Sequence, residues 1–165
     1  MASVLLLALA GDANEQLEKA RKKVVTQGKV CPDPDHPCGD FKPYELSFDI
    51  KKKFEFDRAE DRSAPFFAVI LKSGPLCRIP ESERLDAQKL FPSRKVFVHQ
   101  HQCQGFADAV TYTNVNQKTG FLAVYAGETE AQARQTLAEV KAKAGARFKG
   151  ANVRRMQVVK TYQLE

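Results

Sequence analysis

The chain has 165 residues, the length of one domain or of one domain with a structured extension, and enough to enclose a hydrophobic core. Its 43% hydrophobic and 28% charged residues are typical of an ordinary soluble globular protein, and no stretch is long and apolar enough for a transmembrane helix. The net charge of +6 fits an anionic partner such as a cell-wall polymer, a membrane surface or nucleic acid, but charge does not choose among these.

Residues 2–10 (ASVLLLALA) form an apolar run about half as long as a membrane-spanning helix. The run ends in Ala-Leu-Ala before Gly11, a small-residue pattern that suits signal peptidase, but the basic segment that normally precedes such a run is missing. A buried helix end is the alternative. Because the cysteine count also points to export, we expect residues 1–13 to be a truncated export signal.

Residues 14–64 are expected to form an N-terminal extension with a helix, a cysteine-closed loop and one or two strands. Residues 14–25 (NEQLEKARKKVV) favour a charged surface helix, because a membrane-surface helix would normally carry aromatic anchors. Residues 44–56 alternate between apolar and polar side chains, which is typical of a half-buried strand, or of two strands around the lysines at 51–53.

The four cysteines have two interpretations. Cys31 and Cys38 flank the loop PDPDHP, so metal binding by both thiolates with His36 and an aspartate is one interpretation, but the spacing matches no common zinc pattern. The other is a disulfide-closed loop, and Cys77 and Cys103 would form a second disulfide around a helix–strand unit. The sequence therefore favours the pairs Cys31–Cys38 and Cys77–Cys103 and an oxidising compartment.

From residue 66 onward, apolar runs interrupted by glycine and proline predict alternating strands and helices. Strands are expected at residues 66–73, 95–101, 110–116, 121–126 and 153–159, with the third and fourth forming a hairpin. One helix is expected at residues 80–91, beginning with Pro80. A second helix begins at Thr129, which forms a capping box with Gln132, and ends at Gly145, which suits a left-handed residue.

This order is α+β and matches a ferredoxin-like split β-α-β sheet (βαββαβ). Because β-α-β crossovers are right-handed, both helices would lie on one face of the sheet and leave the other face open. We therefore expect one such sheet over residues 65–165, preceded by the N-terminal helix and strand extension.

Three stretches resemble the sporulation-related repeat (SPOR) domain. Residues 67–73 (FAVILKS) are similar to its first strand, and residues 121–127 (FLAVYAG), followed by a helix that begins EAQA, are similar to its second half. The resemblance covers about residues 66–159. It implies a non-catalytic module of the bacterial cell envelope, periplasmic or otherwise extracytoplasmic, that binds peptidoglycan glycan strands stripped of stem peptides. Ile70, Lys72 and Gly74 depart from the family motif, as does Ala123 or Tyr125 at its basic position, which points to a divergent member with an altered ligand.

In that family the open sheet face binds the glycan, and strand parity places aromatic and basic side chains of this chain there. Aromatic rings would stack on sugars, and basic groups would pair with carboxylates. The candidate glycan-binding residues are Ile70, Lys72, Phe97, His99, Tyr125, Arg154 and Arg155. The alternative is that the strand or strands at residues 44–56 cover this face and make its aromatic side chains part of the core.

Catalysis and metal binding have little support in the sequence. His99 and His101 would point the same way on a strand and could share a metal ion, but no third ligand is fixed. The chain has no nucleophile elbow, H-E-x-x-H motif or P-loop. We expect no metal, no cofactor and a binding module rather than an enzyme.

Two alternative functions stay open. The RNA-recognition motif shares the expected topology and reads bases with aromatic side chains on its sheet, but its glycine- and phenylalanine-rich signature is absent at residues 121–125. The paired cysteines also disfavour a nucleic-acid partner. The other alternative is an envelope domain that contacts proteins without binding glycan.

Overall fold

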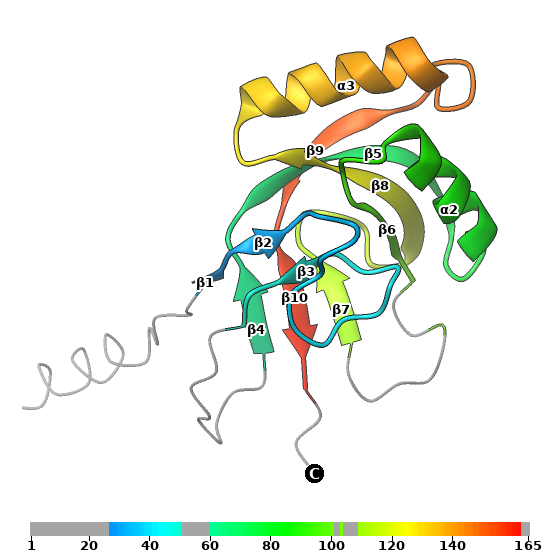
Figure 1. Ribbon diagram of the computed structural model, residues 1–165. Coiled ribbons are helices and arrows are strands. Elements are labelled where there is room, and N and C mark those ends of the chain that lie inside the picture. Colours follow the sequence, from blue (N-terminus) through cyan, green and yellow to red (C-terminus); the bar gives the residue numbers. More distant parts are fainter. Residues whose placement is uncertain (1–26, 51–59, 101–102, 104–108, 163–165) are drawn as a thin grey trace, which may run out of the picture.

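The computed structural model describes residues 27–50, 60–100, 103 and 109–162. The expected export signal at residues 1–13, the expected helix at residues 14–25, His101 and part of the 44–56 segment lie outside these residues. Within them the chain forms ten strands in three sheets and two helices (Figure 1). The strands are β1 (Gln27–Gly28), β2 (Val30–Cys31), β3 (Ser47–Phe48), β4 (Glu60–Ser63), β5 (Phe66–Pro75), β6 (Val96–His99), β7 (Ala109–Tyr112), β8 (Thr119–Gly127), β9 (Asn152–Met156) and β10 (Val158–Thr161), and the helices are α2 (Glu81–Leu90) and α3 (Glu130–Ala144).

One four-stranded antiparallel sheet, in the order β6-β8-β5-β9, carries both helices (Figure 1). Strands β5 and β8 are central because long apolar runs (FFAVIL and FLAVYA) allow both of their faces to be buried. On the helix-bearing face, Val69, Leu122 and Val124 belong to one buried cluster with Ala133 and Val140 of α3. This cluster attaches the helices to the sheet.

The predicted start of α3 and its predicted end at Gly145 are confirmed, but the left-handed conformation expected of Gly145 is wrong. The N–H of Gln132 donates to Thr129 Oγ1 (3.3 Å) and the N–H of Thr129 donates to Gln132 Oε1 (3.0 Å), which completes the capping box. Gly145 is right-handed (φ −56°, ψ −36°), and its N–H donates to the Lys141 carbonyl (3.1 Å), so it prolongs the helical geometry. Gly127, which precedes the helix, has a positive φ (111°).

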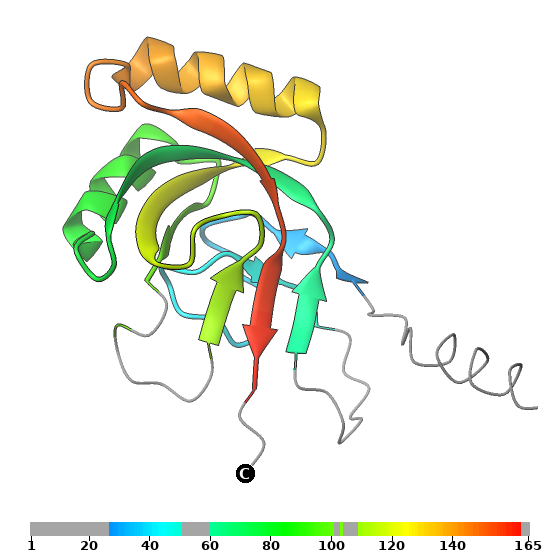
Figure 2. The same ribbon diagram turned by 180° about the vertical axis from the view of Figure 1, so that it is seen from behind.

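The second four-stranded sheet, β1-β4-β10-β7, continues two strands of the first (Figure 2). β4 leads into β5, and β9 leads into β10 through Gln157. At this bend the N–H of Gln157 donates to Thr113 Oγ1 (2.8 Å), and the N–H of Thr113 donates to the Gln157 carbonyl (3.0 Å). The expected strand at residues 153–159 is therefore two strands in different sheets. The expected hairpin of residues 110–116 with 121–126 is also wrong, because β7 pairs with β10.

Residues 27–50 cover the outer edge of β6. They include the two-stranded antiparallel sheet β2-β3. The N–H groups of Lys95 and Val98 donate to the carbonyls of Pro32 and Tyr44, both at 2.9 Å. Lys95 Nζ also donates to the Pro43 carbonyl (2.7 Å). These bonds satisfy an edge that would otherwise be free to pair with another chain.

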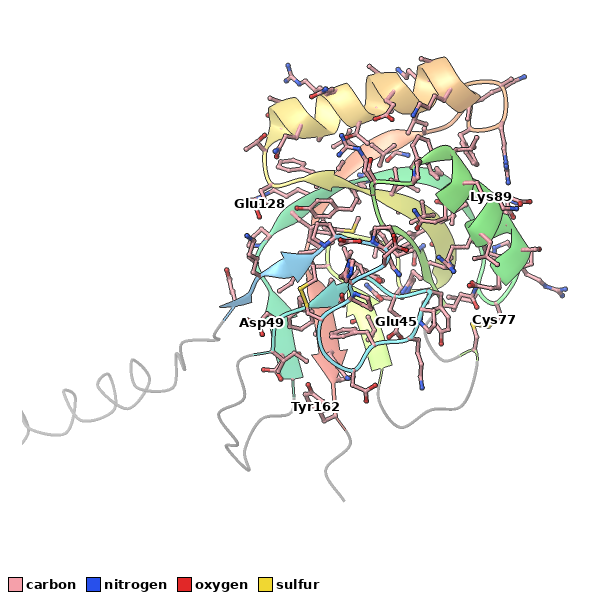
Figure 3. All side chains as sticks on the ribbon, viewed as in Figure 1. Glu45, Asp49, Cys77, Lys89, Glu128 and Tyr162 are labelled. Atoms are coloured by element: carbon pink, nitrogen blue, oxygen red, sulfur yellow. A yellow bond between two sulfur atoms is a disulfide. The ribbon has the colours of Figure 1, made fainter. Side chains whose placement is uncertain are left out.

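An aromatic core lies on the face of the helix-bearing sheet that the helices leave free. The ring of Phe97 lies 5.0 Å from that of Tyr112 and 6.2 Å from that of Phe121, between centroids. Leu46 and Phe48 of the N-terminal segment belong to the same buried cluster. Side chains fill the space between the N-terminal strands and the sheet behind them (Figure 3).

The expected fold, a simple ferredoxin-like βαββαβ sheet with one open face, is therefore wrong. The described chain is mostly β, with three sheets and two helices, and the face expected to be open is closed. The physical reason is burial of apolar surface: Val30, Leu46 and Phe48 leave water by packing on the aromatic side chains of this face.

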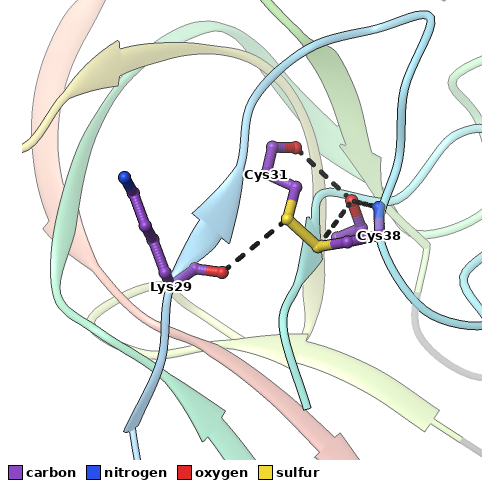
Figure 4. The surroundings of a disulfide bond; sticks show 4 residues. Lys29, Cys31 and Cys38 are labelled. Carbon is purple, nitrogen blue, oxygen red and sulfur yellow. Dashed lines mark hydrogen bonds between the residues drawn. A yellow bond between two sulfur atoms is a disulfide. The ribbon is translucent and has the colours of Figure 1, made fainter. Parts of the chain in front are cut away.

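Both predicted disulfides, Cys31–Cys38 and Cys77–Cys103, are confirmed. Figure 4 shows the first, where Ser47 Oγ accepts from the N–H of Cys38 (3.2 Å) and donates to the Cys31 carbonyl (3.4 Å). Two disulfides fit an extracytoplasmic protein, because such bonds persist in oxidising compartments. No helix in the described ranges has the length and apolar character needed to cross a membrane.

Candidate functional site

Four of the seven candidate glycan-binding residues are buried. Ile70 is 5% exposed, Phe97 and His99 are 0% exposed, and Tyr125 is 8% exposed. The ring of His99 stacks on that of Phe121 at 5.2 Å between centroids, and burial raises the pKa of Tyr125. These aromatic rings pack in the core, as the alternative interpretation proposed, and they are not available to stack on a sugar.

The other three candidates, Lys72, Arg154 and Arg155, are exposed. Ile70 lies opposite Ala123 whereas Lys72 lies opposite Leu122, so β5 has one extra residue between them, a β-bulge. The extra residue reverses the alternation of side chains, and Lys72 therefore points to the helix-bearing face, unlike Ile70. There Lys72 Nζ pairs with Glu83 of α2 at 3.0 Å. The expectation that Ile70 and Lys72 share one face is wrong.

A pocket of about 460 Å³ lies where β5 runs past the end of β9, and we call it the Arg154 pocket. Its volume is in the range of small-molecule sites. Its polar side chains are those of Ser73, Asn114, Asn116, Thr119, Asn152 and Arg154, and its apolar side chains are those of Ile70, Val115 and Phe121. The pocket therefore combines a guanidinium group, three carboxamides and two hydroxyls with an apolar surface.

The turn between β7 and β8 places two of the three carboxamides. Asn114 has φ 60°, a left-handed conformation that asparagine tolerates better than most residues. Its Nδ2 donates to the carbonyl of Arg155 (3.1 Å), which ties the turn to β9. Asn116 Oδ1 accepts from the N–H of Lys118 (2.9 Å), so its side chain also stabilises the turn. Local polar contacts thus fix this wall of the pocket.

A second pocket of about 400 Å³ lies between the end of β5 and the turn at residues 146–150, and we call it the Lys72 pocket. Its basic side chains are those of Lys72, Arg147 and Lys149. Ile70, Ser73 and Asn152 line both pockets. The two pockets therefore adjoin at the edge of β5.

This edge of β5 has no strand partner among the residues that the structure describes. The ladder between β5 and β9 ends at Ile70 opposite Asn152, whereas the ladder between β5 and β8 continues to Pro75. A Cβ atom added at Gly74 would meet no atom within 4 Å, and the same holds for Gly150 across the pocket. The edge is thus accessible between the two pockets.

Both pockets are positively charged. Four basic side chains line them, and Glu83 pairs with one of the four, Lys72. Arg147 lies over the ring of Phe148, 5.1 Å from its centroid. Over the described ranges of the chain, Lys149 and Arg154 take part in no ion pair. Cations without a counter-charge favour an anionic ligand.

Within the described residues, no group of three or more His, Cys, Asp or Glu side chains could hold a metal ion. All four cysteines form disulfides, so none offers a free thiolate to a metal ion. His36, a ligand in the metal-binding interpretation that the sequence disfavoured, contacts Asp33 at 3.0 Å in an exposed loop. The backbone N–H of Asp35, which donates to the carboxylate of Asp33, lowers the pKa of Asp33, and the contact with His36 lowers it further.

Sequence reasoning named Ile70, Lys72 and Arg154, which the structure brings to the end of β5, but missed the other polar residues there. These are Asn114, Asn116, Asn152, Arg147 and Lys149. The polar turn NVNQKTG and the basic turn ARFKG were visible in the sequence. Their spacing gave no sign that both turns meet at the same strand end.

The two pockets thus combine Arg154 and Lys149, cations that form no ion pair among the described residues, with hydrogen-bonding side chains. Because no family model matches the chain, and neither the curated proteins nor the solved structures gave a match, we infer the function of the pockets from their chemistry.

Proposed function

We propose that the chain is a non-catalytic, extracytoplasmic binding module that binds the glycan strands of peptidoglycan at the Arg154 pocket. The observation that carries the proposal is the guanidinium of Arg154, which has no ion-pair partner in the described part of the chain and lies among three carboxamides. The two disulfides support an oxidising compartment such as the cell envelope.

Each chemical group of the pocket has a counterpart on a glycan strand without stem peptides. The guanidinium would pair with the carboxylate of a muramic acid unit. The carboxamides, with the hydroxyls of Ser73 and Thr119, would exchange hydrogen bonds with sugar hydroxyl and acetamido groups. The partly exposed side chain of Val115 would contact sugar C–H groups. One polymer thus supplies all three kinds of contact.

A nucleic-acid partner has less support. Sequence-specific and single-strand readers stack bases on exposed aromatic rings. Phe97, His99 and Tyr125, the rings that would serve on this sheet, are buried. The basic pockets would contact the phosphates of a nucleic acid, but among the described residues its bases would have no exposed ring of this sheet to stack on. We therefore favour the glycan.

The test is binding to purified peptidoglycan sacculi by Arg154→Gln. We expect about tenfold weaker binding, because a hydrogen bond to a charged group contributes about 1.5–3 kcal/mol and 1.4 kcal/mol is tenfold in affinity. The loss should shrink at high salt, which screens the charge in the unmodified protein. RNA and DNA added as competitors should displace sacculi poorly.

Arg134→Gln is the matched control. It makes the same charge change on the exposed first half of α3, where Arg134 pairs with Glu130 of the same helix. This salt bridge is exposed and contributes little to stability. Equal binding by Arg154→Gln and Arg134→Gln would refute the proposal, as would efficient displacement of sacculi by RNA.

A further inference from the structure

We propose that the Lys72 pocket is a second anion subsite, so that one carboxylate-bearing glycan strand crosses the edge of β5 and is held on both faces of the sheet. This inference rests on the proposed function of the Arg154 pocket. It adds that the ligand is a polymer of several repeats, because a single disaccharide would occupy one pocket only.

The β-bulge between Ile70 and Lys72 of β5 creates the second subsite. Before the bulge, Ile70 faces the Arg154 pocket, and after it Lys72 faces the helix-bearing side. Ser73, opposite Phe121, returns to the first face. Consecutive residues of one strand therefore supply groups to both pockets, as expected when a bulge re-aims a side chain.

The turn after α3 supplies the remaining cations. Phe148 is 3% exposed, and its N–H donates to the Ala144 carbonyl (2.9 Å) while its carbonyl accepts from the N–H of Ala151 (3.0 Å). The buried ring anchors the turn, and its two neighbours in the chain, Arg147 and Lys149, are exposed. Both cations are thereby held at the mouth of the Lys72 pocket.

The path between the two subsites is short and accessible. Ile70, Ser73 and Asn152 line both pockets, so the ligand has only the edge of β5 to cross. Gly74 and Gly150 leave open space on either side of this edge. A flexible polymer with repeated carboxylates fits such a path, because the second contact becomes intramolecular once the first has formed.

Glu83 competes with the ligand for Lys72. Both carboxylate oxygens of Glu83 lie 3.0 Å from Lys72 Nζ, while half of the Lys72 side chain stays exposed. A carboxylate on the ligand would have to replace Glu83. Glu83→Gln should therefore strengthen binding of a long strand about twofold, the scale of one exposed ion pair.

The experiment measures affinity for two probes by calorimetry: the disaccharide of N-acetylglucosamine and N-acetylmuramic acid, and an oligosaccharide of four such repeats. The variants are Arg154→Gln, the double variant Arg147→Gln/Lys149→Gln, and the matched double control Arg134→Gln/Lys141→Gln on α3. We expect Arg147→Gln/Lys149→Gln to bind the oligosaccharide about fivefold more weakly and the disaccharide unchanged. Arg154→Gln should weaken binding of both probes.

The outcomes separate the two proposals. If Arg154→Gln weakens both probes but Arg147→Gln/Lys149→Gln weakens neither, the second subsite is refuted and the first stands. Equal weakening of both probes by Arg147→Gln/Lys149→Gln also refutes it, because the pockets would not act on separate parts of a polymer. No effect of Arg154→Gln on either probe refutes the proposed function itself. Thermal unfolding of each variant confirms that it is folded.

Discussion

At the scale of single residues, Tyr112 of β7 links the N-terminal segment, residues 27–50, to the rest of the described chain. Its hydroxyl oxygen accepts a hydrogen bond from the N–H of Leu46 at 3.2 Å, across 66 positions of sequence. Both residues are buried, and burial raises the pKa of the Tyr112 hydroxyl, which therefore stays protonated. Its ring also packs against Phe97 and Phe121. One side chain thus supplies packing to the sheet and an acceptor to the N-terminal segment.

Tyr112→Phe should lower the free energy of unfolding by about 1–3 kcal/mol, because the N–H of Leu46 would stay buried without an acceptor. Tyr125→Phe is the matched control: it also removes a hydroxyl from a largely buried ring, and within the described residues that hydroxyl makes no hydrogen bond. Its effect should stay within about 0.5 kcal/mol. Urea denaturation followed by circular dichroism measures both, and equal losses would contradict the prediction.

At the scale of elements, the disulfides constrain loops of different length. Cys31–Cys38 spans 7 positions of sequence and Cys77–Cys103 spans 26. The longer loop begins just before α2 and passes beyond β6, so it encloses one helix and one strand of the helix-bearing sheet. The shorter one closes the proline-rich loop, which contains Pro32, the residue whose carbonyl accepts from the N–H of Lys95.

Replacing Cys77 and Cys103 by serine should lower the free energy of unfolding by about 3.5 kcal/mol, against about 2.5 kcal/mol for the same change at Cys31 and Cys38, from the loop-closure entropy of the unfolded chain. Denaturation of both double variants under non-reducing conditions tests this order. A larger loss at Cys31 and Cys38 would mean that native contacts of the proline-rich loop, and not loop length, dominate.

At the scale of the whole molecule, residues 27–50 complete the core. Without them, the aromatic face formed by Phe66, Phe97, Phe121 and Tyr125 would be exposed to water. An apolar patch of this kind is uncommon on a monomeric protein and promotes association. Residues 27–50 therefore contribute side chains to the same buried core as the strands that follow them in the chain.

A chain that starts at Glu60 should lose cooperative unfolding and bind the dye 8-anilinonaphthalene-1-sulfonate, which reports exposed apolar surface. The intact chain, measured beside it, should unfold in one transition without dye binding. Phe48→Ala within the intact chain gives an intermediate case, with a loss of about 3–5 kcal/mol for a buried ring. Cooperative unfolding of the chain that starts at Glu60 would contradict this account of the core.

The sequence by itself determined the features that depend on neighbouring residues. The capping box of Thr129 and Gln132 is local, because a cap contacts a residue three positions away. The apolar runs of β5 and β8 are also visible locally, because a continuous run of apolar residues indicates a buried strand whatever covers it. The cysteine number and spacing likewise predicted both disulfides. For the candidate site, the sequence named Arg154 but not the asparagines around it.

Only the tertiary structure decided which surfaces face water. The bulge in β5 turned Lys72 to the opposite face from Ile70, and the pairing of β7 with β10 replaced the expected hairpin. The aromatic rings expected on an open face were buried by residues 27–50. The alternation of side chains along a strand tells which neighbouring side chains share a face of the sheet. It does not tell which segment packs on that face, because burial of apolar surface between segments far apart in the chain decides this.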